Sequence, residues 1–175
     1  MWAWGGNSSS QLGDNTTTSR TAPVQIGAAR SWSKISAGSN HSAAVAADGT
    51  LWTWGLNSSS QLGLNDTTTR TIPTQVGTAT DWSRVACGGS FTVAMKTDGT
   101  LWAWGDNMWG GFANGTAGSG GSSAPTLVNS ISDVAWIAMG KRFAVGVKGD
   151  GTAWSWGDNN FGELGYGGTA DKRSP

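Results

Sequence analysis

The chain has 175 residues, and its 11 basic and 11 acidic side chains give a formal net charge of zero. A zero balance disfavours a dedicated nucleic-acid-binding protein, which needs clustered Lys and Arg to displace counterions. No apolar run approaches the roughly 20 residues of a membrane-spanning helix, the first residues lack the features of a signal peptide, and the single cysteine excludes an intrachain disulfide framework.

A Trp-x-Trp-Gly element recurs along the chain at steps of 50, 50 and 52 residues, and the four prolines recur at steps of 50, 52 and 50. Self-similarity at a fixed period is the signature of a repeat architecture. The spacing predicts one repeat domain with about 3.5 units of about 50 residues. The expected units are a partial unit at 1–22, followed by 23–72, 73–124 and 125–175.

Each unit is expected to contain about four short strands. Residues 82–86 alternate apolar and polar side chains, which is the pattern of a half-buried strand. A glycine pair ends this strand, and further strands are predicted over residues 91–95 and 101–105. A last strand is expected at 73–77, where its proline is tolerated at the first position or on a sheet edge. No stretch shows a helical period, so the fold class is predicted to be all-β.

The hairpin turns and the core are predicted from the same repeat. Asp-Gly pairs favour tight type I′ turns, in which both central residues have positive φ. The predicted turn residues are Asp48, Gly49, Asp98, Gly99, Asp150 and Gly151. Because the strand tryptophans recur in every unit, we expect them to pack inside and between the units rather than to bind a ligand. The predicted core tryptophans are Trp4, Trp52, Trp54, Trp102, Trp104, Trp154 and Trp156. A further pair, Trp32 and Trp82, is also 50 residues apart, and Trp136 follows after 54.

One loop departs from the repeat and is the candidate contact surface. Two units carry an Asn-Ser-Ser-Ser-Gln-Leu-Gly loop, whereas the loop after Trp104 has lost the Gln-Leu-Gly element. Trp109 in this loop is interpreted as having no counterpart in the other units, and it is flanked by Met108 and Phe112. An aromatic side chain on a variable loop is a candidate for partner recognition. We therefore predict a protein contact at Trp109, Met108 and Phe112.

The sequence offers no catalytic constellation. His41 is the only histidine, so one copy of the chain cannot form a histidine-based zinc site or acid–base dyad. Cys87 aligns with Ala37 and Met139, which predicts a buried and inert thiol. Each Asp-Gly-Thr turn supplies one carboxylate, too few for a calcium loop. We therefore expect no enzyme activity, no metal and no cofactor.

The repeat resembles the regulator-of-chromosome-condensation repeat family. The resemblance rests on Gly38-Ser39-Asn40-His41-Ser42, on Asp48-Gly49-Thr50-Leu51-Trp52-Thr53-Trp54-Gly55 and on Gln61-Leu62-Gly63, and it extends over the whole chain. It implies a β-propeller whose blades have about four antiparallel strands. Family propellers usually close with seven blades, so about 3.5 blades would form a partial or open ring. We expect a part of a longer chain, a homodimer that completes the ring, or an open arc capped by something else.

The function expected from these features is that of a non-enzymatic scaffold that binds another protein through its loop faces. The low charge and the near-identical units favour as an alternative a structural component of a larger secreted, cell-surface or virion assembly. The resemblance adds, by family analogy alone, a guanine-nucleotide-exchange regulator. We expect no nucleic-acid partner and no membrane insertion, and the sequence does not indicate a compartment.

Overall fold

The computed structural model describes residues 1–116, 118 and 120–175 and contains strands and turns but no helix in these residues. The predicted all-β class is confirmed. The strands are β1 (Trp2–Gly5), β2 (Arg20–Gln25), β3 (Trp32–Ala37), β4 (His41–Ala46), β5 (Leu51–Gly55), β6 (Arg70–Gln75), β7 (Trp82–Cys87), β8 (Phe91–Lys96), β9 (Leu101–Gly105), β10 (Ser122–Val128), β11 (Val134–Met139), β12 (Phe143–Lys148) and β13 (Ala153–Gly157).

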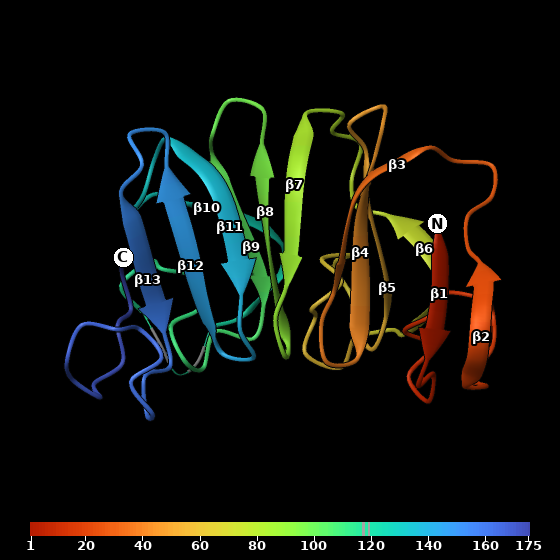
Figure 1. Ribbon diagram of the computed structural model, residues 1–175, viewed down its shortest axis with the longest axis horizontal. Helices are drawn as coiled ribbons and strands as arrows, with labels where there is room; N and C mark the ends of the chain where they lie inside the picture. Colours follow the sequence, from red (N-terminus) through yellow and green to blue (C-terminus); the bar gives the residue numbers. More distant parts are fainter. Residues whose placement is uncertain (117, 119) are drawn as a thin grey trace.

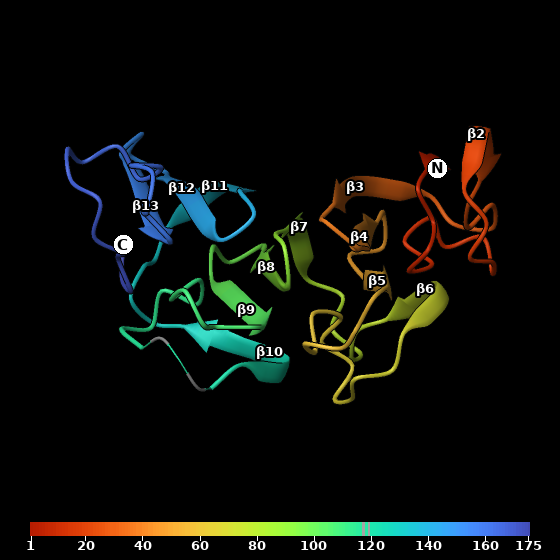
Figure 2. The ribbon, with the colours of Figure 1, turned by 90° about the horizontal axis from the view of Figure 1, so that it is seen from below.

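These strands form four antiparallel sheets in an arc, as Figure 1 and Figure 2 show. Two sheets are complete, with the orders β3-β4-β5-β6 and β7-β8-β9-β10. The first sheet contains only β1 and β2, and the last contains β11, β12 and β13 with one added bridge between Gly157 and Lys172. In each complete sheet the first strand is innermost, and β3, β7 and β11 lie next to one another along the concave side of the arc (Figure 2). The units bounded by proline are offset from the sheets, since Pro73 lies inside the outer strand β6.

The Asp-Gly turns lie in the hairpins between the second and third strands, but their geometry differs from the prediction. Gly49 has a φ of 78°, whereas Asp48 does not have a positive φ, so the type I′ assignment is wrong. The Gly49 N–H donates to the Ala46 carbonyl over 3.0 Å, and the Ala46 N–H donates to Thr50. This is a type I turn followed by a glycine bulge, which also suits the twist of a hairpin.

The aspartate of each turn holds the following threonine. Both the N–H and the hydroxyl of Thr50 donate to Asp48 Oδ1, over 3.0 and 2.6 Å, and these bonds lower the pKa of the carboxyl group. The Trp52 indole N–H then donates to Thr50 Oγ1 over 2.8 Å. The same chain of bonds occurs in the two later hairpins. The repeated Asp-Gly-Thr therefore orients the first tryptophan of each Trp-x-Trp-Gly strand.

The second tryptophan of that strand joins neighbouring sheets. The Trp54 indole N–H donates over 2.9 Å to the carbonyl of Gln11, in the loop of the preceding sheet. Trp104 and Trp156 make the same bond to Gln61 and Gly111. All three rings are buried. They explain the glycine of the Gln-Leu-Gly element, because a Cβ at Gly13 or Gly63 would lie 2.7 Å from the indole nitrogen of the packed tryptophan. The bond itself ends on a backbone carbonyl, which Gly111 supplies as well as glutamine does.

Two predicted core tryptophans lie instead on the surface. Trp4 is 61% exposed, because no described sheet precedes its own and none supplies the loop on which Trp54 and Trp104 pack. Trp154 is 40% exposed. Its counterparts Trp52 and Trp102 pack edge-on against Trp32 and Trp82 on the innermost strand, at centroid distances of 6.3 and 6.2 Å.

In the last sheet, tryptophan does not occupy the position equivalent to Trp32 and Trp82. The alignment of Trp136 with these two residues is therefore wrong. Val134 pairs with Lys148 as Trp82 pairs with Lys96, which places Val134 at the equivalent position. Trp136 lies two residues further along β11, where it is 45% exposed. Trp154 consequently lacks the aromatic partner that covers Trp52 and Trp102.

Candidate functional site

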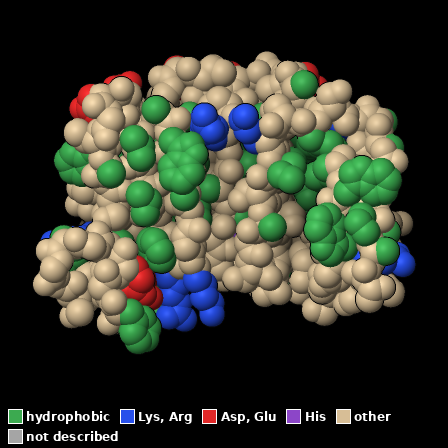
Figure 3. All heavy atoms as spheres, in the orientation of Figure 1, with side chains coloured by type: hydrophobic (Ala, Val, Ile, Leu, Met, Phe, Trp, Pro, Cys, Tyr) green, Lys and Arg blue, Asp and Glu red, His purple; other side chains and the backbone are tan. Residues whose placement is uncertain are grey.

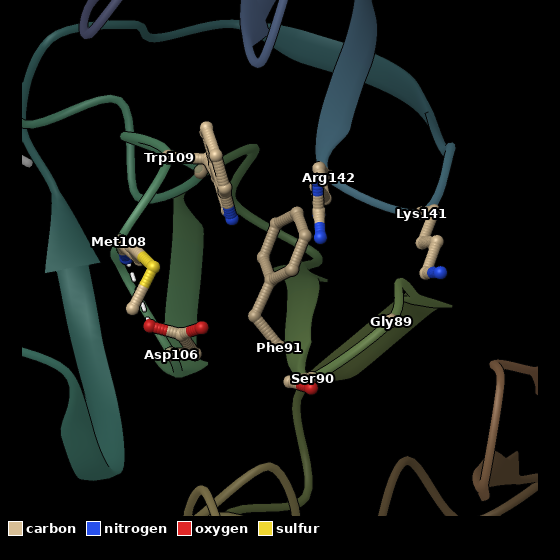
Figure 4. Close-up of a pocket in the computed structure, with 9 residues that line it drawn as sticks. Gly89, Ser90, Phe91, Asp106, Met108, Trp109, Lys141 and Arg142 are labelled. Carbon is tan, nitrogen blue, oxygen red and sulfur yellow. Dashed lines mark hydrogen bonds between the residues drawn. The ribbon is translucent and has the colours of Figure 1, made fainter.

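The long loops that follow β1, β5, β9 and β13 form one face of the molecule (Figure 1), which we call the loop face. It contains a cavity of about 190 Å³ between the last two sheets. Figure 4 shows it between the loop that follows β9 and the turns that precede β8 and β12. Its residues are Gly89, Ser90, Phe91, Asp106, Met108, Trp109, Gly111, Lys141 and Arg142, and we call it the loop-face pocket. It combines apolar and aromatic side chains with two cations and one carboxylate.

Met108 and Trp109 present the apolar part of this pocket. Met108 is 55% exposed, and its backbone N–H donates to Asp106 Oδ1 over 2.8 Å, which fixes the start of the loop. Trp109 is half-buried and its ring faces Arg142, whose guanidinium carbon lies 4.5 Å from the ring centroid. Arg142 also approaches Asp158 at 3.8 Å. The cation–π contact therefore restricts the Trp109 ring, which stays partly exposed.

Two residues that differ from their equivalents in the other units form one wall of the pocket. Phe91 occupies the position of His41 on the equivalent strand, and Gly111 occupies the position of Gln11 and Gln61. A Cβ at Gly111 would lie 2.6 Å from the Phe91 ring, so the ring in this position leaves no room for a glutamine at 111. In this unit the loss of glutamine therefore accompanies the phenylalanine at position 91.

Phe112 is a core residue, and its assignment as a partner contact is wrong. Its side chain is 2% exposed and packs in the cluster that contains Trp156. The Phe112 N–H donates to Asn107 Oδ1 over 3.0 Å, as the Leu12 and Leu62 N–H groups donate to their own loop asparagines. Phe112 thus replaces the leucine of the repeat.

The same hydrogen-bond register reveals a residue that the sequence analysis missed. Phe161 is the second residue after Asn159, as Trp109 is after Asn107, so Trp109 does have a counterpart. Phe161 is 91% exposed. Counting from the loop asparagine would have found it, whereas counting from Gln-Leu-Gly fails in the loop that has lost this element. The last two loops of the face thus both carry an aromatic residue where the first two carry serine.

Two titratable side chains outside this pocket, Cys87 and His41, are buried. Burial raises the pKa of the Cys87 thiol to about 12, so the thiol stays protonated and is not a nucleophile at neutral pH. His41 Nε2 lies 2.9 Å from Thr92 Oγ1, between two sheets. Within the described ranges, no group of three or more His, Cys, Asp or Glu side chains could hold a metal ion. Nor does any helix long and apolar enough to span a membrane occur in this part of the chain.

His41 gives the fold a predictable acid sensitivity. Burial lowers its pKa from 6.5 to about 4, so the unfolded chain binds a proton more readily than the folded one. This histidine's stabilising contribution is therefore complete above about pH 6.5 and is lost as the pH falls toward 4. We expect the free energy of unfolding to drop by about 2 kcal/mol between pH 7 and pH 5, as measured by urea titration. His41→Phe, which copies Phe91, should remove most of this drop, and an unchanged drop would contradict the assignment.

Comparison with known proteins identifies relatives of the repeat. The sequence matches the regulator of chromosome condensation (RCC1) repeat over residues 1–45 and 48–95, and a second form of this repeat over 32–61 and 134–163. No curated protein sequence matches the chain.

Among solved structures, human WBSCR16 is similar, with a TM-score of 0.88 and 22% identity over 99% of this chain and 47% of that one. Yeast RCC1 (Prp20), solved with Kap60 bound, gives a TM-score of 0.83 and 25% identity over 99% of this chain and 43% of that one. Another structure of Prp20p from Saccharomyces cerevisiae, a protein described as binding Gsp1p and histones, gives 0.80 and 25%, and covers 99% and 45% of the two chains. The predicted partial β-propeller is thereby confirmed, and the chain spans less than half the length of each of these structures.

Proposed function

The chain belongs to the regulator of chromosome condensation (RCC1) repeat family, and we propose that it is a non-enzymatic scaffold that binds another protein through its loop face. The observation that carries the proposal is the loop-face pocket, where Met108 and Trp109 replace the Ser58-Ser59 pair of the preceding unit. An exposed methionine beside an anchored tryptophan gives an apolar contact that a solvated serine loop does not have.

The residue types of the pocket suit a protein partner. Trp, Met and Arg are enriched in the centres of protein interfaces, where an aromatic side chain fills a pocket on the partner. Trp109 supplies a large contact area, and its cation–π contact with Arg142 restricts its motion before binding. The related Prp20 binds proteins, including Kap60 and Gsp1p, and this also favours a protein partner.

We do not extend the proposal to nucleotide exchange, because the chain spans less than half the length of the solved structures that it matches. A structural component of a larger assembly would use the same loops. The polar loops of the repeat, however, do not favour any particular binding partner in such an assembly. The Met108–Trp109 pair differs from Ser8-Ser9, Ser58-Ser59 and Asn160-Phe161 at the same positions of the other loops, and this difference favours recognition of a defined partner over a repeated structural contact.

The test uses the repeat itself as the source of substitutions. Met108→Ser with Trp109→Ser makes this loop resemble the preceding one, and we expect a change in the free energy of unfolding below about 1 kcal/mol. Proteins captured from an extract of the producing cells by the wild-type chain would be identified by quantitative mass spectrometry and then titrated, once purified, by calorimetry. The double variant should bind the purified partner at least about tenfold more weakly, which is 1.4 kcal/mol.

Ser58→Ala with Ser59→Ala is the matched control, because it changes the same loop positions in the neighbouring unit. This control should bind the partner as the wild type does. Equal loss in both variants, or no loss in the Met108 and Trp109 variant, would contradict the proposal. Turnover of a substrate by the purified chain would contradict its non-enzymatic part.

A further inference from the structure

Three equivalent side chains form a row across the concave side of the arc. Lys34 on β3, Arg84 on β7 and Trp136 on β11 pair respectively with Val45, Met95 and Val147 of the second strands. In each sheet the register shifts by one residue just before this position. A β-bulge of this kind re-aims the following side chain, and such bulges are frequent beside binding sites.

The row borders a cavity of about 310 Å³, lined by residues of all three innermost strands. Its lining includes Lys34, Arg84 and Trp136 but no Asp or Glu. Figure 3, which views this side of the molecule, shows two basic side chains next to each other near the centre and a large hydrophobic side chain beside them. Lys34 and Arg84 thus give the cavity a positive charge, and Trp136 gives it an aromatic surface.

The two cations have no carboxylate partner within the described residues. Some of the other basic residues are paired, namely Arg20 with Asp14 and Arg70 with Asp66, both at 2.6 Å, and Lys96 with Asp81 at 3.2 Å. No such ion pair involves Lys34 or Arg84 in the part of the chain that the structure describes. Like charges that face one cavity repel each other, and an anion bound between them would replace this repulsion by attraction.

We propose that this concave-face site binds an acidic segment of another polypeptide, with its carboxylates on Lys34 and Arg84 and a neighbouring apolar or aromatic side chain on Trp136. The three positions lie on three adjacent strands, so the ligand extends across the arc. A peptide with an apolar residue next to Glu or Asp offers both chemistries, whereas a small phosphate would use the cations alone. The proposal concerns a different surface from the loop-face pocket and does not depend on it.

The test is calorimetric titration of the folded chain with the peptide Glu-Glu-Phe-Glu-Glu. Lys34→Gln with Arg84→Gln should weaken binding by at least about tenfold. Raising the salt concentration should weaken wild-type binding, since partly exposed ion pairs are screened. Trp136→Ala should weaken binding of this peptide but leave unchanged the binding of Glu-Glu-Gly-Glu-Glu. Thermal unfolding should show that none of these variants is destabilised enough to unfold at the temperature of the titration.

The matched control removes two charges elsewhere: Lys172→Gln with Arg173→Gln changes two exposed residues that line neither cavity. It should retain peptide binding within about twofold. An equal loss in both double variants would mean non-specific attraction and would overturn the proposal. Competition by inorganic pyrophosphate as strong as that of the peptide, together with no effect of Trp136→Ala, would identify a small-phosphate site and would also overturn it. No binding by the wild type would overturn it without affecting the loop-face proposal.

Discussion

Replacing Trp104 by alanine is expected to lower the free energy of unfolding by about 3–5 kcal/mol, the usual cost of emptying an aromatic core site. The side chain is fully buried, and its ring packs against Trp82 at a centroid distance of 6.3 Å. Its indole N–H also donates over 3.0 Å to the Gln61 carbonyl of the preceding sheet. The substitution therefore removes apolar packing and leaves a buried carbonyl with one partner fewer.

Trp4→Ala is the matched control, because Trp4 has the same place in the repeat but is 61% exposed. Its effect should stay below about 1 kcal/mol. Both values come from urea unfolding at pH 7, and Trp104→Phe should recover part of the loss by restoring an aromatic ring without the N–H donor. Equal effects of Trp4→Ala and Trp104→Ala would show that contact between sheets is not what stabilises the repeated tryptophan.

This contrast also shows which part of the fold the sequence can predict. The period, the all-β class and the hairpins follow from local patterns, because turn residues and alternating strands recur at fixed steps. Burial of a particular tryptophan does not, because it depends on the neighbouring sheet. Trp4 and Trp104 have the same local sequence, and only the loop that Gln61 belongs to makes one of them a core residue.

The candidate site was predicted in part for a similar reason. Trp109 and Met108 stand out because they break a repeated polar loop, and the structure places both at one pocket. Phe112 was misassigned because leucine and phenylalanine exchange at a core position while the flanking residues also change. Arg142 could not be connected with Trp109 from the sequence, since the two residues come from different sheets.

The Lys34–Arg84–Trp136 row could not be predicted from the sequence, for a different physical reason. Each residue is unremarkable in its own strand, and the one-residue bulge before it displaces it from simple alternation. Trp136 was moreover matched to the wrong position, because the spacing of 54 residues resembles the repeat period. Only the strand register shows that two cations and an aromatic ring occupy one level of the inner surface.

Asn57 is expected to contribute almost as much stability as the buried tryptophans, although it is a loop residue. Its side chain is fully buried, and its Oδ1 accepts the Leu62 N–H over 2.9 Å. Its Nδ2 donates to the Asp66 carbonyl over 2.9 Å and to Asp66 Oδ1 over 3.0 Å. The Asn57 amide therefore forms hydrogen bonds with two separate segments of the long loop. The equivalent Asn7 also bonds to two segments of the loop in the preceding unit.

We expect Asn57→Ala to lower the free energy of unfolding by about 2–4 kcal/mol, because it leaves the buried Leu62 N–H and the partly buried Asp66 carbonyl without their partner. Asn57→Asp retains the size and the acceptor but removes the donor and places a second carboxylate beside Asp66. It should therefore also destabilise, and by less at a pH low enough to protonate the new carboxylate. Ser58→Ala, at the exposed neighbouring position, should change stability by less than about 0.5 kcal/mol. If Asn57→Asp proved as stable as the wild type in urea unfolding at pH 7, the donor role of the amide would be wrong, and the loop would depend on Leu62 packing instead.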